Sequence, residues 1–77
     1  MIDLQWGAPF DAGHGHFRSE CEPLPGWFAI VQTESSGEFR WASYTITGPD
    51  DLRVEGEAAD VDRAKSTVAK ICEALRE

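Results

Sequence analysis

The sequence predicts a small α+β domain in which an antiparallel sheet of three or four strands packs against one C-terminal helix. Residues 27–58 contain segments rich in aromatic and β-branched residues, separated by turn sequences. Residues 60–76 carry apolar residues at three- and four-residue spacing, which is typical of an amphipathic helix. A chain of 77 residues can build one small hydrophobic core, so we expect a single domain over residues 1–77.

The first 26 residues predict little regular structure. Residues 2–6 alternate apolar and polar side chains and predict one short strand. Residues 7–26 are rich in glycine and proline, so we expect an irregular arm there. Because Phe10, Phe17 and Leu24 are embedded in this arm, we expect it to lie down on the sheet.

Three strands are expected between residues 27 and 58. Residues 27–33 and 38–47 form a hairpin around the turn at residues 34–37, and residues 52–58 follow a second turn. The alternation in this last strand places Leu52, Val54, Gly56 and Ala58 on one face, and Arg53, Glu55 and Glu57 on the other.

The register of the hairpin decides which of its side chains share a face. A three-residue loop with Gly37 in the left-handed region would place Val31 opposite Trp41. One face would then carry Phe28, Ile30, Ala42, Tyr44 and Ile46, and the other Trp27, Ala29, Val31, Phe39 and Trp41. Since one helix covers one face, the second apolar face needs another cover. The N-terminal arm (through Trp6 and its other large apolar residues), a second copy of the chain and a partner protein are all open alternatives.

The helix is expected to begin after Asp60, whose carboxylate can accept hydrogen bonds from the free amides of the first turn. Asp62 places a favourable negative charge near this end, while Lys70 and Arg76 lie towards the other end. The apolar stripe consists of Val61, Ala64, Val68, Ile71 and Leu75, with Cys72 beside it. A coiled-coil seam would need more heptads, so we expect a helix packed on the sheet.

Negative charge dominates the chain, with 14 acidic against 7 basic residues and a net charge of −7. Free nucleic acid and anionic membranes would be repelled, whereas a basic protein surface would be attracted. The acidic candidates for partner binding are Asp50, Asp51, Glu55, Glu57, Asp60 and Asp62, together with Glu34 and Glu38 at the first turn. Such a row of charge can face a groove that binds phosphates, although the same charges also protect a sheet edge from aggregation. Trp27 and Trp41 are the candidate aromatic anchors of such an interface.

His14, His16 and Cys21 are residue types that bind metals, which leaves a small metal-binding module as an alternative. Zinc sites usually have two ligand pairs separated by a longer loop, and this loop has one. A nucleophilic Cys21 would need a fixed base, an orienting group and an oxyanion site, and a glycine-rich loop is a poor platform for them. We therefore expect neither a cofactor nor a metal, and no enzymatic activity.

Residues 27–75 combine an aromatic hairpin that ends in W-A-S-Y-T-I, a V-E-G-E-A strand and the helix A-K-S-T-V-A-K-I-C-E-A-L. In size, charge and pattern this segment resembles short acidic proteins of phages and prophages, a group that includes anti-CRISPR proteins. The resemblance implies a phage-type inhibitor that binds the basic nucleic-acid channel of a host protein complex, such as a CRISPR surveillance complex, and blocks DNA binding. From the net negative charge we expect no direct contact with nucleic acid or membrane.

A self-associating structural or regulatory phage protein is a further alternative, and both a monomer and a homodimer fit the sequence. With two cysteines and no charged-then-apolar leader, we expect the protein in the cytoplasm of a bacterial host. The sequence leaves open whether Cys21 and Cys72 are free thiols.

Overall fold

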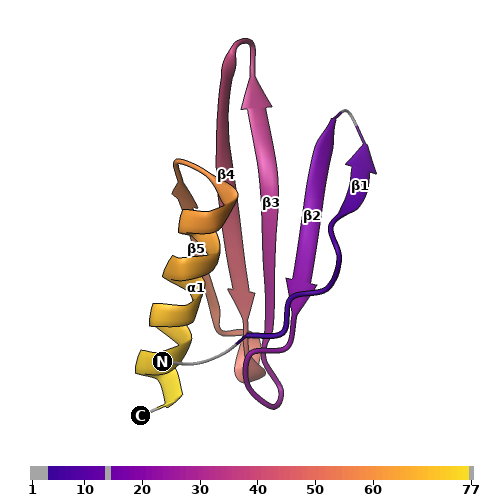
Figure 1. The fold of residues 1–77 in the computed structure, drawn as a ribbon. Coiled ribbons are helices and arrows are strands. Elements are labelled where there is room, and N and C mark those ends of the chain that lie inside the picture. Colours follow the sequence, from indigo (N-terminus) through magenta and orange to yellow (C-terminus); the bar gives the residue numbers. More distant parts are fainter. Residues whose placement is uncertain (1–3, 14, 77) are drawn as a thin grey trace.

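The computed structural model describes residues 4–13 and 15–76. Five antiparallel strands form a meander in the order β1-β2-β3-β4-β5, and a helix follows the last strand (Figure 1). The elements are β1 (Phe10–Gly13), β2 (His16–Cys21), β3 (Phe28–Ser36), β4 (Phe39–Thr47), a short 3-10 turn η1 (Pro49–Asp51), β5 (Arg53–Ala58) and α1 (Val61–Arg76). The predicted α+β architecture with a C-terminal helix is confirmed, whereas the predicted count of three or four strands is too low.

The additional strands come from the segment expected to be an irregular arm. β1 and β2 form a hairpin in which Phe10 pairs with Arg18, with an irregularity between Asp11 and Gly13. Glycine does not disrupt this hairpin but shapes its turn, because Gly13 and Gly15 have φ angles of 95° and 77°. The strand predicted over residues 2–6 is not formed at residues 4–6, and its first two residues lie outside the described part of the chain.

The β3–β4 hairpin has a tighter turn than expected. Ser36 pairs with Phe39, which leaves Gly37 and Glu38 as a two-residue loop. Gly37 has a φ of 61° and Glu38 has no positive φ, which is the pattern of a type II′ turn. The expectation of a three-residue loop was therefore wrong.

The corrected register changes which side chains share a face. Val31 pairs with Tyr44 instead of Trp41, and Ala29 pairs with Ile46. Side chains alternate between the two faces along a strand. If one strand shifts against its neighbour by an odd number of residues, all side chains that shared a face with that neighbour's residues move to the opposite face. The small apolar residues of β3 and β4 therefore lie together, and the two equally apolar faces expected from the sequence do not form.

α1 covers the face that carries these small residues, which we call the helix face. The buried core consists of Ala29, Val31, Ala42 and Ile46 from the sheet and Ala64, Val68 and Cys72 from the helix. The predicted N-cap is confirmed, because the Arg63 amide donates a hydrogen bond of 2.8 Å to Asp60 Oδ1. The apolar stripe fades at the end of the helix, where Leu75 is 42% exposed.

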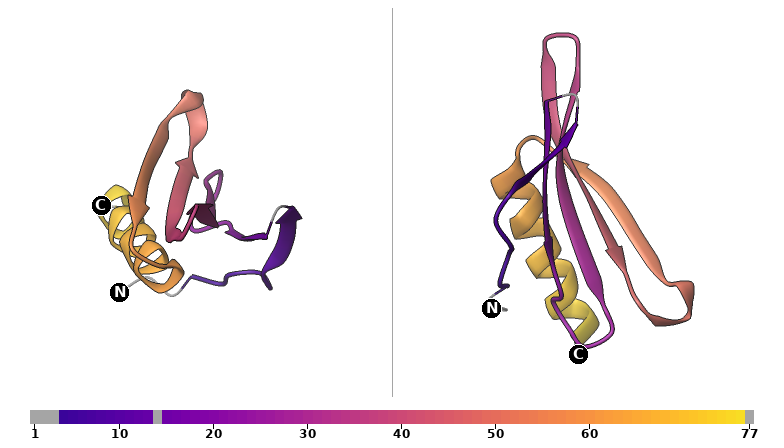
Figure 2. Two further views of the ribbon diagram at one scale, coloured as in Figure 1. Left: turned by 90° about the horizontal axis from the view of Figure 1, so that it is seen from above. Right: turned by 90° about the vertical axis from the view of Figure 1, so that its right-hand side faces the viewer.

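The first described residues pack on the same side of the sheet as the helix (Figures 1 and 2). Leu4 and Trp6 contact the core cluster, and the Gly7 amide donates a 2.9 Å hydrogen bond to the Glu20 carbonyl. Phe10 and Phe17, which belong to the arm that was one candidate cover for the second face, are 46% and 52% exposed. The described part of the arm therefore leaves the second face of the sheet uncovered.

Candidate functional site: the open face and the acidic edge

The face of the sheet opposite α1 is an ordered grid of side chains, which we call the open face. Cross-strand pairing sets its rows as Phe28, Thr47 and Arg53, then Glu20, Ile30, Thr45 and Glu55, then Phe10, Arg18, Gln32, Ser43 and Glu57, and last Glu34 and Trp41. Side chains opposite one another in neighbouring strands are close enough to interact. The open face is therefore one surface to which all five strands of the described sheet contribute.

The second row of the open face has an apolar centre between two carboxylates. Glu20 pairs with Ile30, Ile30 with Thr45, and Thr45 with Glu55. Phe28 lies two residues from Ile30 on the same strand face and is 58% exposed. The centre of the open face is thus apolar and solvent-accessible, and negative charge lies on both sides of it.

A network of hydrogen bonds occupies the rows above this centre. Arg18 donates to Gln32 Oε1 from Nε and Nη2 at 2.9 and 2.6 Å, and Gln32 Nε2 donates to Glu34 Oε1 at 2.9 Å. The Ser43 hydroxyl donates to the same Glu34 oxygen at 3.2 Å, and His16 Nδ1 lies 3.9 Å from Glu34 Oε2. Glu34, a candidate for partner binding, is therefore already engaged by neighbouring side chains.

A shallow hollow of about 270 Å³ lies between β4 and β5. Its lining residues are Ser43, Tyr44, Thr45, Glu55, Gly56 and Glu57. The hydroxyls of Ser43 and Thr45 and the carboxylates of Glu55 and Glu57 belong to the open face. Such a set of acceptors suits an ammonium or guanidinium group.

The six carboxylates between residues 50 and 62 follow one side of the molecule, which we call the acidic edge. Asp50 and Asp51 lie in η1 before β5, Glu55 and Glu57 on β5, and Asp60 and Asp62 at the start of α1. All six are exposed. β5 is an edge strand of the sheet, so the acidic edge runs from one end of that edge to the other.

Two arginines partly neutralise the acidic edge. Arg53 forms an ion pair with Glu55, and Arg63 Nε lies 3.7 Å from Asp60 Oδ2. Both pairs are more than half exposed, and exposed ion pairs stabilise a fold by about 0–1 kcal/mol. A stronger partner can therefore displace these arginines at little cost.

The remaining candidate residues lie away from the acidic edge. Trp27 lies on the helix face, because it packs against the core cluster and its ring covers Gly48. Trp41 lies on the open face opposite Glu34. Glu38 lies in the turn at the end of the β3–β4 hairpin. Sequence reasoning missed that exposed Phe28 and half-buried Ile30 form the centre of the open face, because the assumed register grouped them with buried Ile46.

The proposed metal ligands do not converge. His16 lies on the open face beside Glu34, whereas Cys21 packs against the core on the helix face, about 16 Å further along the strand. His14 lies outside the described residues. Within residues 4–13 and 15–76, no group of three or more His, Cys, Asp or Glu residues is placed to hold a metal ion. One ion therefore cannot be shared by His16 and Cys21.

Cys21 is also a poor nucleophile. Burial, followed by the nearby Cys72 thiol, raises the pKa of Cys21 from 9.0 to about 11, although Lys65 opposes the shift. Burial likewise raises the pKa of Cys72. Because the thiolate is the reactive form, a raised pKa lowers the reactivity of each thiol near neutral pH.

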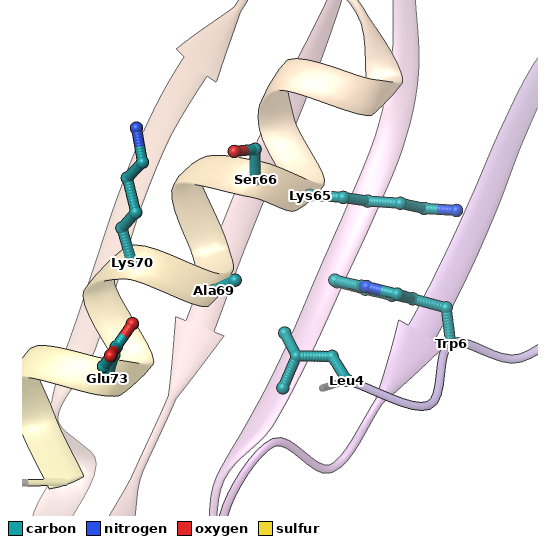
Figure 3. A pocket seen from close by; sticks show the side chains of 7 residues that line it. All are labelled: Leu4, Trp6, Lys65, Ser66, Ala69, Lys70 and Glu73. Carbon is teal, nitrogen blue, oxygen red and sulfur yellow. The ribbon is translucent and has the colours of Figure 1, made fainter. Parts of the chain in front are cut away.

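A second concavity lies on the helix side, between the arm and α1 (Figure 3). It has a volume of about 280 Å³ and is lined by Leu4, Trp6, Lys65, Ser66, Ala69, Lys70 and Glu73. Lys65 Nζ lies 5.4 Å from the centre of a Trp6 ring, a cation–π contact that ties the arm to the helix. This groove combines the charged residues Lys65, Lys70 and Glu73 with apolar side chains.

Comparison with protein-family models, with curated proteins and with solved structures found no match for this chain. In the part of the chain that the structure describes, no helix is both long and apolar enough to cross a membrane.

Proposed function

We propose that this protein is a phage-type inhibitor of the anti-CRISPR kind, which binds a basic nucleic-acid-binding surface of a host protein complex and blocks DNA binding. The single observation that carries this proposal is the continuity of the acidic edge with an uncovered sheet face. Glu55 and Glu57 belong to both surfaces. A partner can therefore meet negative charge and apolar contact area at one place.

Electrostatics supports a basic partner. The chain carries a net charge of −7, which accelerates encounter with positive surfaces and disfavours contact with nucleic acid itself. Glu55 and Glu57 point to the same side of β5, about 6.6 Å apart along the strand. The edge strand is about 20 Å long, so its charges can span several basic side chains of a DNA-binding groove.

A charge-removal experiment tests this function. The wild-type protein, immobilised, is exposed to a bacterial lysate at low salt, and the retained proteins are challenged with excess duplex DNA. We expect retention of nucleic-acid-binding proteins that the DNA displaces, and loss of this retention in Glu55→Gln/Glu57→Gln. The neutral variant keeps the side-chain length, so the fold is preserved.

The matched control is Asp11→Asn/Glu22→Gln, which removes the same charge away from β5. Both residues are exposed, and the asparagine side chain keeps the oxygen that accepts a 2.7 Å hydrogen bond from the Gly13 amide. The proposal would be contradicted if both double variants retained the same amount of protein from the lysate. It would also be contradicted if duplex DNA did not displace the retained proteins. If the charges only protect the β5 edge, Glu55→Gln/Glu57→Gln will aggregate in light scattering without changing retention.

A further inference from the structure

We infer that the open face is a docking site for a basic amphipathic α-helix of the partner protein, lying along β3 and β4. This inference rests on the proposed function and specifies the partner's binding element. It follows from the width, the apolar centre and the charge pattern of the open face.

The width of the open face fits a helix. Glu20 on β2 and Glu55 on β5 end the row that runs through Ile30 and Thr45. Three inter-strand spacings separate their backbones by about 14 Å, and an α-helix with its side chains is about 10–12 Å wide. A helix resting on β3 and β4 therefore has a carboxylate within reach on each side.

The centre of this surface supplies the apolar contact. Phe28 and Ile30 project from β3 to the open face, and Thr47 and Thr45 lie opposite them on β4. Phe28 is 58% exposed although it lies within a sheet, so a ligand can bury it. Glu20 and Glu55 end the row through Ile30, so this surface is complementary to a helix with one apolar stripe and basic residues on both sides of it.

The hollow on β5 gives one of the basic residues a specific position. Glu55 and Glu57 provide carboxylates, and Ser43 and Thr45 provide hydroxyls around about 270 Å³ of open space. A lysine or arginine on the flank of the docked helix enters this hollow. Arg53 forms an ion pair with Glu55 from the same strand. The incoming basic residue either displaces Arg53 from Glu55 or shares the Glu55 carboxylate with it.

The positive charge of Arg18 limits the length of the site. Arg18 lies in the row after Glu20 and is held by two hydrogen bonds to Gln32. The favourable surface therefore extends from Phe28 to about Gln32, or about 13 Å along the strand. That length corresponds to about two to three turns of helix.

Titration of isotope-labelled protein with two synthetic peptides tests this inference. Both peptides contain the same leucines and lysines over about five helical turns. In one peptide the leucines form a single stripe flanked by lysines, and in the other they are dispersed. We expect the striped peptide to bind at least about tenfold more tightly, and its amide shift changes to lie on β3, β4 and β5.

Phe28→Thr provides the matched protein variant, because threonine suits a strand and Phe28 contributes little to the core. We expect it to weaken binding of the striped peptide about tenfold and to leave the dispersed peptide unaffected. Equal binding of both peptides, or shift changes on α1, would overturn the inference. So would a dimer that Phe28→Thr converts to monomer, because a second copy would then occupy the face.

The inference and the proposed function fail separately. If Phe28→Thr retains the partner proteins from the lysate while Glu55→Gln/Glu57→Gln loses them, the helix-docking inference is wrong and the proposed function stands. If Glu55→Gln/Glu57→Gln retains them as well as the control does, the proposed function is wrong.

Discussion

The two faces of this sheet are made by the same strands but differ in how they are filled. The helix face carries small apolar side chains that α1 buries, whereas the open face carries long, mixed side chains that the described chain leaves in solvent. Both faces contain residues that favour strands. Strand preference and burial are therefore separate properties, because both faces favour strands but α1 packs only on the face with small apolar side chains.

The helix face also uses glycine to accommodate aromatic rings. A Cβ at Gly56 would overlap the ring and hydroxyl of Tyr44, its cross-strand partner. A Cβ at Gly48 would lie 2.5 Å from two ring carbons of Trp27. Each ring therefore lies over the backbone of a glycine. In this position the rings fill space that the small core residues leave.

The largest expected contrast between the faces comes from shortening one isoleucine on each. Ile46 is fully buried on the helix face, so Ile46→Ala should lower the free energy of unfolding by about 2–5 kcal/mol. Ile30 is half-buried on the open face, and Ile30→Ala should cost about 1 kcal/mol or less. Urea unfolding followed by circular dichroism measures both.

If Ile46→Ala does not fold, Ile46→Val, expected to cost about 0.5–1.5 kcal/mol, keeps the contrast measurable. Equal losses at Ile46 and Ile30 would mean that the open face is covered in solution.

A smaller effect should follow from adding one methyl group at Gly56. Ala normally suits a strand better than Gly, but here the new methyl group meets the Tyr44 ring. We expect Gly56→Ala to destabilise by about 1–3 kcal/mol, as in other overpacked sites. Glu57→Ala, which changes the open face of the same strand, should stay within about 0.5 kcal/mol.

The same substitution in a Tyr44→Leu background shows whether the ring is the cause. The cost of Gly56→Ala should fall there, since the overlapping atoms are gone. An unchanged cost would assign the loss to the backbone of β5 instead of the aromatic contact.

The smallest effect is a pH dependence confined to the helix face. The pKa of Cys21 rises from 9.0 to about 11 on folding, so the unfolded chain loses this proton first as pH increases. The stabilisation is complete below pH 9 and is lost as pH rises through 9 to 11. Thermal unfolding should therefore show a steeper fall in Tm over this range for the wild type than for Cys21→Ala.

The wild type and Cys21→Ala differ in one ionisable group, so the difference between the two slopes reports on Cys21. Parallel slopes would contradict a buried, protonated thiol.

Local patterns predicted the C-terminal half of the fold well. The helix begins after Asp60 as expected, and Val54, Gly56 and Ala58 share the face opposite Glu55 and Glu57. These features depend on neighbours within a few residues. The β1–β2 hairpin was missed because its glycines predicted an irregular loop, whereas Gly13 and Gly15 shape a turn between two strands.

The candidate site was predicted only in part. The carboxylates of the acidic edge were identified from the sequence, because they are close together along the chain. The sequence did not show that these carboxylates share a face with Phe28 and Ile30. That arrangement depends on the register between β3 and β4, which differs from the assumed register by an odd number of residues.

By itself, the sequence determined the charge of this protein, its C-terminal helix and the alternation of its last strand. These follow from composition and from periodicity within single segments. The tertiary structure alone decided which face of each strand is buried, that His16 and Cys21 lie on opposite sides of the sheet, and that an apolar ridge lies between acidic flanks. The physical reason is that register and helix packing join residues distant in the chain, and a two-residue turn in place of a three-residue one exchanges the faces.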